Sequence, residues 1–161
     1  MSNLTKQLKQ LDVSKLKLKN GNTVENELRQ HASILADCIM KELDKVYDER
    51  EPAVYKRTYR LYDALYIDNF VQVIVSSAGA NLSIGLHFDD GAMKKNFNDE
   101  EVNTAILLNE GWQTKGKFRD VPYFGYRKGT HFIDKGIERY KISVSNPFTV
   151  RFTVNDEVRV Y

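Results

Sequence analysis

The feature that most constrains the fold is a run of apolar residues at helical spacing between positions 24 and 46. It consists of Val24, Leu28, Ala32, Leu35, Ile39, Leu43 and Val46. Side chains at this spacing share one face of an α-helix, so the pattern predicts one long amphipathic helix. We expect Asn22 to cap it, with Glu25 completing a capping box, and Pro52 to end it. Because the apolar face is wide, we expect the helix to lie across a β-sheet.

Two later regions have the composition and alternation of β-hairpins. Residues 70–75 are rich in branched and aromatic side chains, and residues 82–88 alternate after a turn. Gly85 is expected to mark a bulge or the close approach of another backbone. Near the C-terminus, a three-residue loop at 155–157 would pair Val154 with Val158. This register keeps the apolar residues on one face, so it is the register we predict.

The remaining segments predict shorter helices and one long loop. Helical spacing covers residues 56–65, residues 99–109 after an N-cap at Asp99, and residues 131–140. Residues 112–130 contain several glycines and are expected to form an irregular loop. This order of elements predicts an α+β fold. A mostly antiparallel β-sheet would pack against one long and several short helices, with a C-terminal β-hairpin. We expect a basic N-terminal arm or short helix at 1–20, followed by a single α+β domain at 21–161.

Composition indicates a globular chain and excludes several classes. Of the 161 residues, 42% are hydrophobic and 29% are charged, which argues against wholesale disorder. No apolar run reaches the roughly 20 residues that span a bilayer, so no membrane partner is expected. The single Cys38 allows no internal disulfide. Residues 1–20 contain five lysines and one acidic residue, so a small basic DNA-binding module is one alternative function.

A second alternative is a metal-dependent hydrolase. His87, Asp89 and Asp90 lie close together in the sequence, and His131 is a candidate fourth ligand. Imidazole and carboxylate groups are suitable metal ligands. Asp89 and Asp90 precede a glycine, however, and this combination is also typical of a turn. The favoured interpretation therefore assigns no catalytic, cofactor-binding or metal-binding residue, and expects no cofactor.

Short motifs spread over residues 24–140 give the chain a family resemblance. Arg57, Thr58, Leu61 and Ala64 follow the long helix, and His131 and Phe132 open a late helix. This combination resembles the tailed-bacteriophage head–tail joining or tail-completion (neck) protein family. The chain departs from the family at Tyr59, where glycine is usual. Tyr59 implies a continuous helical turn at that point.

The resemblance implies a structural virion protein without enzymatic activity. Copies would form a closed ring, such as a hexamer, at the head–tail junction or at the head-proximal end of the tail. Its partners would be other neck or tail proteins, with non-specific contact to DNA in the channel. It would be found in the virion, and in the host cytoplasm during assembly. The candidate interface residues are Trp112, Phe118, Tyr123, Phe124 and Tyr126. Whether these aromatic side chains meet a partner or cover the domain's own core stays open.

Overall fold

The computed structural model describes residues 15–48, 60–76, 79–89, 93–95, 101–118, 121–154 and 157–161. Its helices are α2 (Val24–Asp48), α3 (Arg60–Ala64), α4 (Thr104–Glu110) and α5 (Phe132–Ser143). Its strands are β1 (Leu65–Ile67), β2 (Gln72–Ser76), β3 (Gly79–Ser83), β4 (Leu86–Phe88), β5 (Met93–Lys95), β6 (Glu101–Asn103), β7 (Gly111–Phe118), β8 (Val121–Lys128), β9 (Arg151–Val154) and β10 (Glu157–Val160). The predicted α+β class, with one long helix and a C-terminal hairpin, is confirmed.

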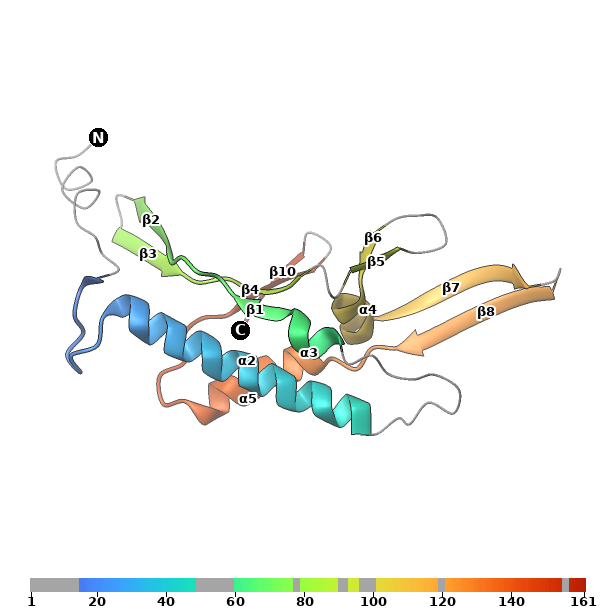
Figure 1. Ribbon diagram of the computed structural model, residues 1–161, viewed down its shortest axis with the longest axis horizontal. Coiled ribbons are helices and arrows are strands. Elements are labelled where there is room, and N and C mark those ends of the chain that lie inside the picture. Colours follow the sequence, from blue (N-terminus) through green and yellow to red (C-terminus); the bar gives the residue numbers. More distant parts are fainter. Residues whose placement is uncertain are drawn as a thin grey trace.

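The strands form small sheets instead of one large sheet. Each sheet has two antiparallel strands, and the pairs are β1–β4, β2–β3, β5–β6, β7–β8 and β9–β10. α2 does not lie across a single sheet as expected. It crosses α5, packs against it and contacts β1 (Figure 1). Among the described helices, none is both long and apolar enough to cross a membrane.

The core lies between the helix pair and the strands beside it. Ile39 and Leu43 of α2 meet Phe132 and Ile137 of α5 in one buried cluster. The two helices come very close at Gly136, where a Cβ atom would lie 2.6 Å from the Ile39 Cα atom. Side chains of the β1–β4 and β9–β10 pairs cover the cluster, and they include Leu65, Leu86, Phe88 and Phe152.

The long helix is confirmed, but its predicted cap is wrong by one residue. α2 begins at Val24, and the Thr23 hydroxyl accepts a hydrogen bond from the Asn26 N–H at 3.2 Å. Asn22 lies in a turn instead, because its own N–H donates to the Asn20 side chain at 3.0 Å. The Asn22 amide then donates to Glu27. The predicted stop at Pro52 lies outside the described residues.

The predicted strand 82–88 is divided at Gly85 into β3 and β4. The carbonyl of Gly85 accepts a hydrogen bond from the Asp68 N–H at 2.9 Å. A Cβ atom at Gly85 would lie 2.2 Å from the Asp68 carboxylate and 2.3 Å from the His87 ring, so a larger residue would require these two side chains to shift. The predicted close approach of a backbone at Gly85 is therefore confirmed. It turns β4 away from β3 and onto β1, a pairing that the sequence pattern did not predict.

Two other predicted boundaries are wrong. Within the described residues, helix α4 begins at Thr104, and Asn103 caps it by accepting from the Ala105 N–H at 2.9 Å. Asp99, the expected cap, lies outside the described residues. Gly111 ends α4 as predicted, with a φ of 87°. The helix expected at 56–65 is described only as α3, and the chain enters β1 at Leu65.

Residues 112–130 do not form an irregular loop. They contain most of β7 and all of β8. The two strands pair without interruption, from Gly111 opposite Lys128 to Phe118 opposite Val121. The prediction placed too much weight on the glycines. Gly116 and Gly125 each lie opposite a residue with a side chain in the neighbouring strand, so the ladder accommodates them.

The C-terminal hairpin does not have the predicted register. Val154 pairs with Glu157 and Phe152 pairs with Arg159, so the loop has two residues instead of three. Val158 and Val160 consequently lie on the exposed face, at 56% and 64% exposure. The physical reason is that Arg159 is needed on the inner face, where it binds carboxylates of α4 and α5.

Candidate functional site

The β7–β8 hairpin is the longest paired element of the described structure, and we call it the arm. Each of its strands has eight residues, which gives a length of about 27 Å. Figure 1 shows the arm reaching away from the helices, with its base beside α4. Of its two strands, β7 is the one with substantial contacts to α4. The arm therefore presents most of its length away from the core.

The base of the arm is held firmly by the end of α4. The Thr130 N–H and hydroxyl both donate to the Leu108 carbonyl, at 3.0 and 2.8 Å. The His131 N–H donates to the Asn109 carbonyl at 3.0 Å. Gly129 passes so close that a Cβ atom would lie 2.4 Å from the same carbonyl oxygen. These contacts fix the direction in which the arm leaves the body.

The predicted interface residues all lie on the arm. Trp112 is at its base in β7 and is half-buried. The others are spread along the two strands and are Phe118 in β7 and Tyr123, Phe124 and Tyr126 in β8. Beyond Trp112, the side chains of this set lie outside the described part of the structure. Whether they contact a partner stays a prediction.

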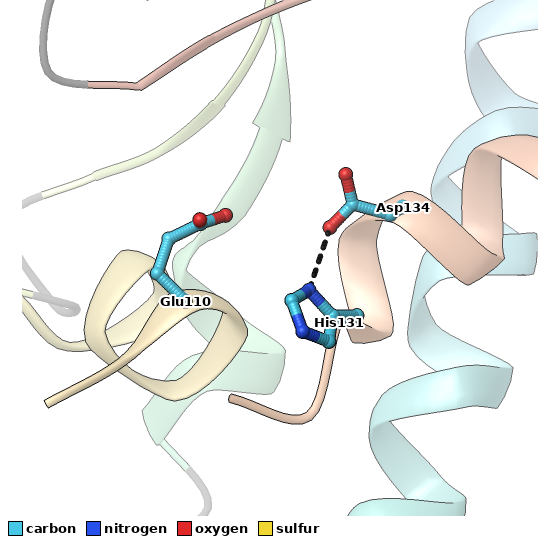
Figure 2. A group of neighbouring side chains, drawn as sticks. All are labelled: Glu110, His131 and Asp134. Atoms are coloured by element: carbon cyan, nitrogen blue, oxygen red, sulfur yellow. Dashed lines mark ion pairs between the residues drawn. The ribbon is translucent and has the colours of Figure 1, made fainter. Parts of the chain in front are cut away.

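The predicted metal ligands are not gathered at one point in the described part of the chain. His87 lies on β4 and interacts with Asp68, with its Nε2 atom 3.1 Å from a carboxylate oxygen. The Asp89 N–H donates to the Ala64 carbonyl, and Asp90 lies outside the described residues. His131 belongs to a different group, with Glu110 and Asp134, whose ligating atoms lie within 4.8 Å of one another. Figure 2 shows the His131 ring beside Asp134, with Glu110 on the neighbouring helix.

Asn109 positions the two carboxylates of this second group. It is fully buried, and its amide nitrogen donates to Glu110 at 2.7 Å and to Asp134 at 2.8 Å. Its amide oxygen accepts from the Ile133 N–H at 2.8 Å, in the first turn of α5. One side chain thus joins the end of α4 to the start of α5 and aligns both carboxylates.

Arg159 and Tyr161 complete the group from the C-terminal strand. The Arg159 guanidinium donates to Glu110 at 2.7 and 2.9 Å and to Asp134 at 3.1 Å. The Tyr161 hydroxyl also donates to Asp134. The guanidinium carbon lies 5.8 Å from the centre of the Phe152 ring, which supports it from the neighbouring strand. We call these residues, Asn109, Glu110, Asp134, Arg159 and Tyr161, the clasp.

Electrostatics in the clasp favour ionised carboxylates. The hydrogen bond from Arg159 is the main reason that the pKa of Glu110 is lowered, although burial opposes it. Burial would raise the pKa of Asp134, but hydrogen bonds from Tyr161, Asn109 and Arg159 outweigh it and the pKa is lowered. Burial, followed by the bond to Asp134, raises the pKa of Tyr161 to about 12. The hydroxyl therefore remains a donor at neutral pH.

The clasp holds the fold together and is not arranged as an open metal centre. A guanidinium occupies both carboxylates, so a cation would have to displace Arg159 before it could bind. His131 adds little to the group, because its Nδ1 atom is 3.6 Å from Asp134 and its side chain is half exposed. Its backbone is left-handed, with a φ of 53°, and it precedes α5 without a capping side-chain bond.

Some of the family-motif residues lie in the core, and others lie outside the described residues. Leu61 and Ala64 are buried on α3, and Phe132 is fully buried at the start of α5. These three pack in the same cluster as Ile39 and Leu43, so they have a structural role. Arg57 and Thr58 lie outside the described residues.

Comparisons with known proteins give no assignment. No protein-family model, curated protein or solved structure matches the chain.

Sequence reasoning missed the clasp. Asp134 lies 25 residues after Asn109, and Arg159 lies 25 residues after Asp134, so no local motif joins them. One signal was present in the C-terminal hairpin. A two-residue turn places Arg159 among inward-facing apolar residues, and a charge in that position requires an acidic partner.

Proposed function

We propose that the chain is a structural virion protein of a tailed bacteriophage. It would form a ring at the head–tail junction or at the head-proximal end of the tail, in the manner of head–tail joining and tail-completion proteins. The motif resemblance and one structural observation support this proposal. That observation is the arm, which is anchored rigidly at its base and extends about 27 Å from the core.

An extended two-stranded hairpin is only marginally stable in water unless its faces or edges are covered. Within the described residues the arm has no third strand, and its main contact with the body is at α4. A neighbouring subunit would supply the missing contact. The aromatic residues of the arm, such as Trp112 and Tyr126, are of the types that dominate the binding energy of protein interfaces.

The test is the oligomeric state of the purified chain with and without the arm. Gly111 and Lys128 pair at the arm's base, so their Cα atoms lie only about 5.5 Å apart. A short Gly-Ser turn can therefore replace residues 112–127. Gly129 and Thr130 must remain, because Thr130 anchors the base to Leu108. As a matched control, Asn-Gly at positions 119 and 120 changes only the tip between the strands.

We expect the unmodified chain and the tip variant to form rings, measured by light scattering and electron microscopy. The armless variant should keep the helical circular dichroism signal and the melting temperature, but remain a monomer. A full-length chain that stays monomeric at every concentration it tolerates would contradict the proposal. If the armless variant forms rings equally well, the arm has no part in the subunit contact.

A further inference from the structure

The stretch from Phe70 to Leu86, which includes β2 and β3, contains no charged residue or histidine. In a chain with 29% charged residues, seventeen positions would hold about five charges. Part of the stretch is nevertheless exposed to solvent. Phe70 is 82% exposed and Ile74 is 62% exposed. An uncharged but exposed segment needs an explanation other than the domain's own core.

One face of the β2–β3 hairpin is open and the other is only partly covered, because Asn81 is exposed whereas Leu82 is half-buried. Val73 and Ile74 are consecutive in β2, so their side chains point to opposite faces, and both are exposed. β2 and β3 contact chiefly each other, and Figure 1 shows them rising from the body at the end opposite to the arm. The hairpin therefore offers its apolar residues outward.

The edges of this hairpin also lack the usual protection. Soluble proteins guard exposed strand edges with lysine, proline or a bulge. β2 and β3 pair continuously from Gln72 and Ser83 towards the turn, without a bulge, and contain no lysine or proline. In the described structure they form a two-stranded sheet, so β2 has one edge without a strand neighbour, as does β3 from Ala80 to Ser83. Such edges are suited to the addition of another strand.

We propose that the free edge of β2 in one copy of this chain pairs with the edge of β3 in the next copy. This inference rests on the proposed function and names the contact that would close the ring. Because β2 and β3 are antiparallel within a copy, rotation to the next copy brings β3 alongside β2 in the antiparallel sense. The hairpins would together form one continuous antiparallel sheet.

Charge and geometry favour a second copy over other occupants. A nucleic acid would require cationic side chains on the hairpin, and the stretch has none. Because neither edge carries a charged side chain, pairing the two edges buries no unpaired charge. A closed ring also needs two different complementary surfaces on each subunit, and the edges of β2 and β3 provide such a pair.

Two charge variants test this contact. Ile74→Lys and Asn81→Glu each place a charge on an exposed residue, so the monomer should keep its melting temperature. Ile74 and Asn81 pair within a copy, so across the proposed contact they belong to the two strands that meet. Each variant alone should require at least about tenfold higher concentration to form rings. An equal mixture of the two should recover assembly, because lysine of one copy then meets glutamate of the next.

Controls separate this inference from its rivals. Val160→Lys alters an equally exposed strand residue on β10 and should assemble as the unmodified chain does. If Ile74→Lys also assembles normally while the unmodified chain forms rings, this contact is excluded and the proposed function stands. Recovery in a mixture of Ile74→Lys with Ile74→Glu, but not with Asn81→Glu, would show that β2 pairs with β2 and would overturn the proposed pairing.

A segment of the same chain is the remaining rival occupant. Hydrogen exchange of residues 70–86 in the dilute monomer decides this point. We expect rapid exchange at the outward-facing amides and about tenfold or greater slowing in the ring. Protection already present in the monomer would mean that the chain covers its own edge, and the inference would be wrong. If the unmodified chain forms no ring at all, both the inference and the proposed function are wrong.

Discussion

The hairpins β9–β10 and β2–β3 have a similar local construction but different connections to the molecule. Both are short antiparallel pairs whose strands are separated by two residues. β9–β10 buries one face, where Val154 is 6% exposed, and Arg159 ties it to α4 and α5. β2–β3 leaves Val73 and Ile74 exposed on opposite faces and carries no charge.

The difference shows what makes a hairpin part of a domain. A strand ladder alone does not fix a hairpin to the body, because the ladder is satisfied within the hairpin. Burial of one face and a polar tie to distant elements do so in β9–β10. In β2–β3 neither face is fully buried and no charged side chain ties the hairpin to the body, and this is why we propose that it joins a second copy.

The largest effect is expected from breaking the centre of the clasp. Asn109→Ala removes hydrogen bonds to two carboxylates and leaves the Ile133 N–H without its acceptor. We expect the free energy of unfolding to fall by about 3 kcal/mol, measured by urea denaturation. The control Asn22→Ala removes an exposed bond to Glu27 and should cost less than about 0.5 kcal/mol. A similar cost for both variants would contradict the role of the clasp.

The second prediction compares the two hairpins directly. Phe152→Ala removes a ring that packs against the core and supports Arg159, and should lower the free energy of unfolding by about 2 kcal/mol. Ile74→Ala, in the exposed hairpin, should cost less than about 0.5 kcal/mol. Equal losses in thermal melts of the dilute monomer would mean that β2–β3 is also part of the core.

A smaller effect is expected at the C-terminal tyrosine. Tyr161→Phe removes the hydroxyl that donates to Asp134 and changes little else. The expected loss is about 1 kcal/mol in the free energy of unfolding. Tyr66→Phe, on the exposed side of β1, is the matched control and should leave the stability unchanged. If Tyr161→Phe is equally silent, the hydroxyl does not contribute to holding β10.

The last prediction concerns pH, and the effect that it describes is the smallest and most gradual. Glu110 and Asp134 have lowered pKa values in the folded chain, so they stabilise it above their unfolded pKa values of about 4. This stabilisation is lost as the pH falls through the lower folded values. The Arg159→Met variant lacks this donor and is less stable than the unmodified chain at neutral pH. This difference in stability should shrink as the pH is lowered from about 6 to about 3.

Arg151→Met is the matched control for the pH series. Arg151 lies in the same hairpin on its exposed face, so this change should leave the pH dependence as it is. Melting temperatures across the series give the comparison. A constant gap between Arg159→Met and the unmodified chain would show that the clasp carboxylates do not titrate with folding.

Sequence patterns predicted the elements whose signals are local. The α2 stripe, the α5 spacing and the existence of the C-terminal hairpin all follow from neighbouring residues. The cap at Thr23 and the start of α4 at Thr104 were missed because several polar residues nearby could serve as caps. The β7–β8 strands were missed because glycines obscured their alternation.

Local sequence patterns could predict neither the clasp nor the register of the C-terminal hairpin. Apolar alternation favoured pairing Val154 with Val158, whereas the structure pairs Val154 with Glu157. The deciding interactions join Arg159 to Glu110 and Asp134, 49 and 25 residues away. A register fixed by such distant charges becomes visible only when the helices that carry them are placed. The candidate interface on the arm was named from its aromatic residues alone and stays a prediction.

Hydrogen exchange across the whole chain, compared between the dilute monomer and the assembled form, tests the central claim most directly. The claim is that β9–β10 belongs to the fold, whereas β2–β3 and the arm are there to join subunits. We predict that amides of β9–β10 are protected equally in both states, and that those of β2–β3 and β7–β8 gain protection only on assembly. Equal protection of all three hairpins in the monomer, or no assembled form at all, would contradict it.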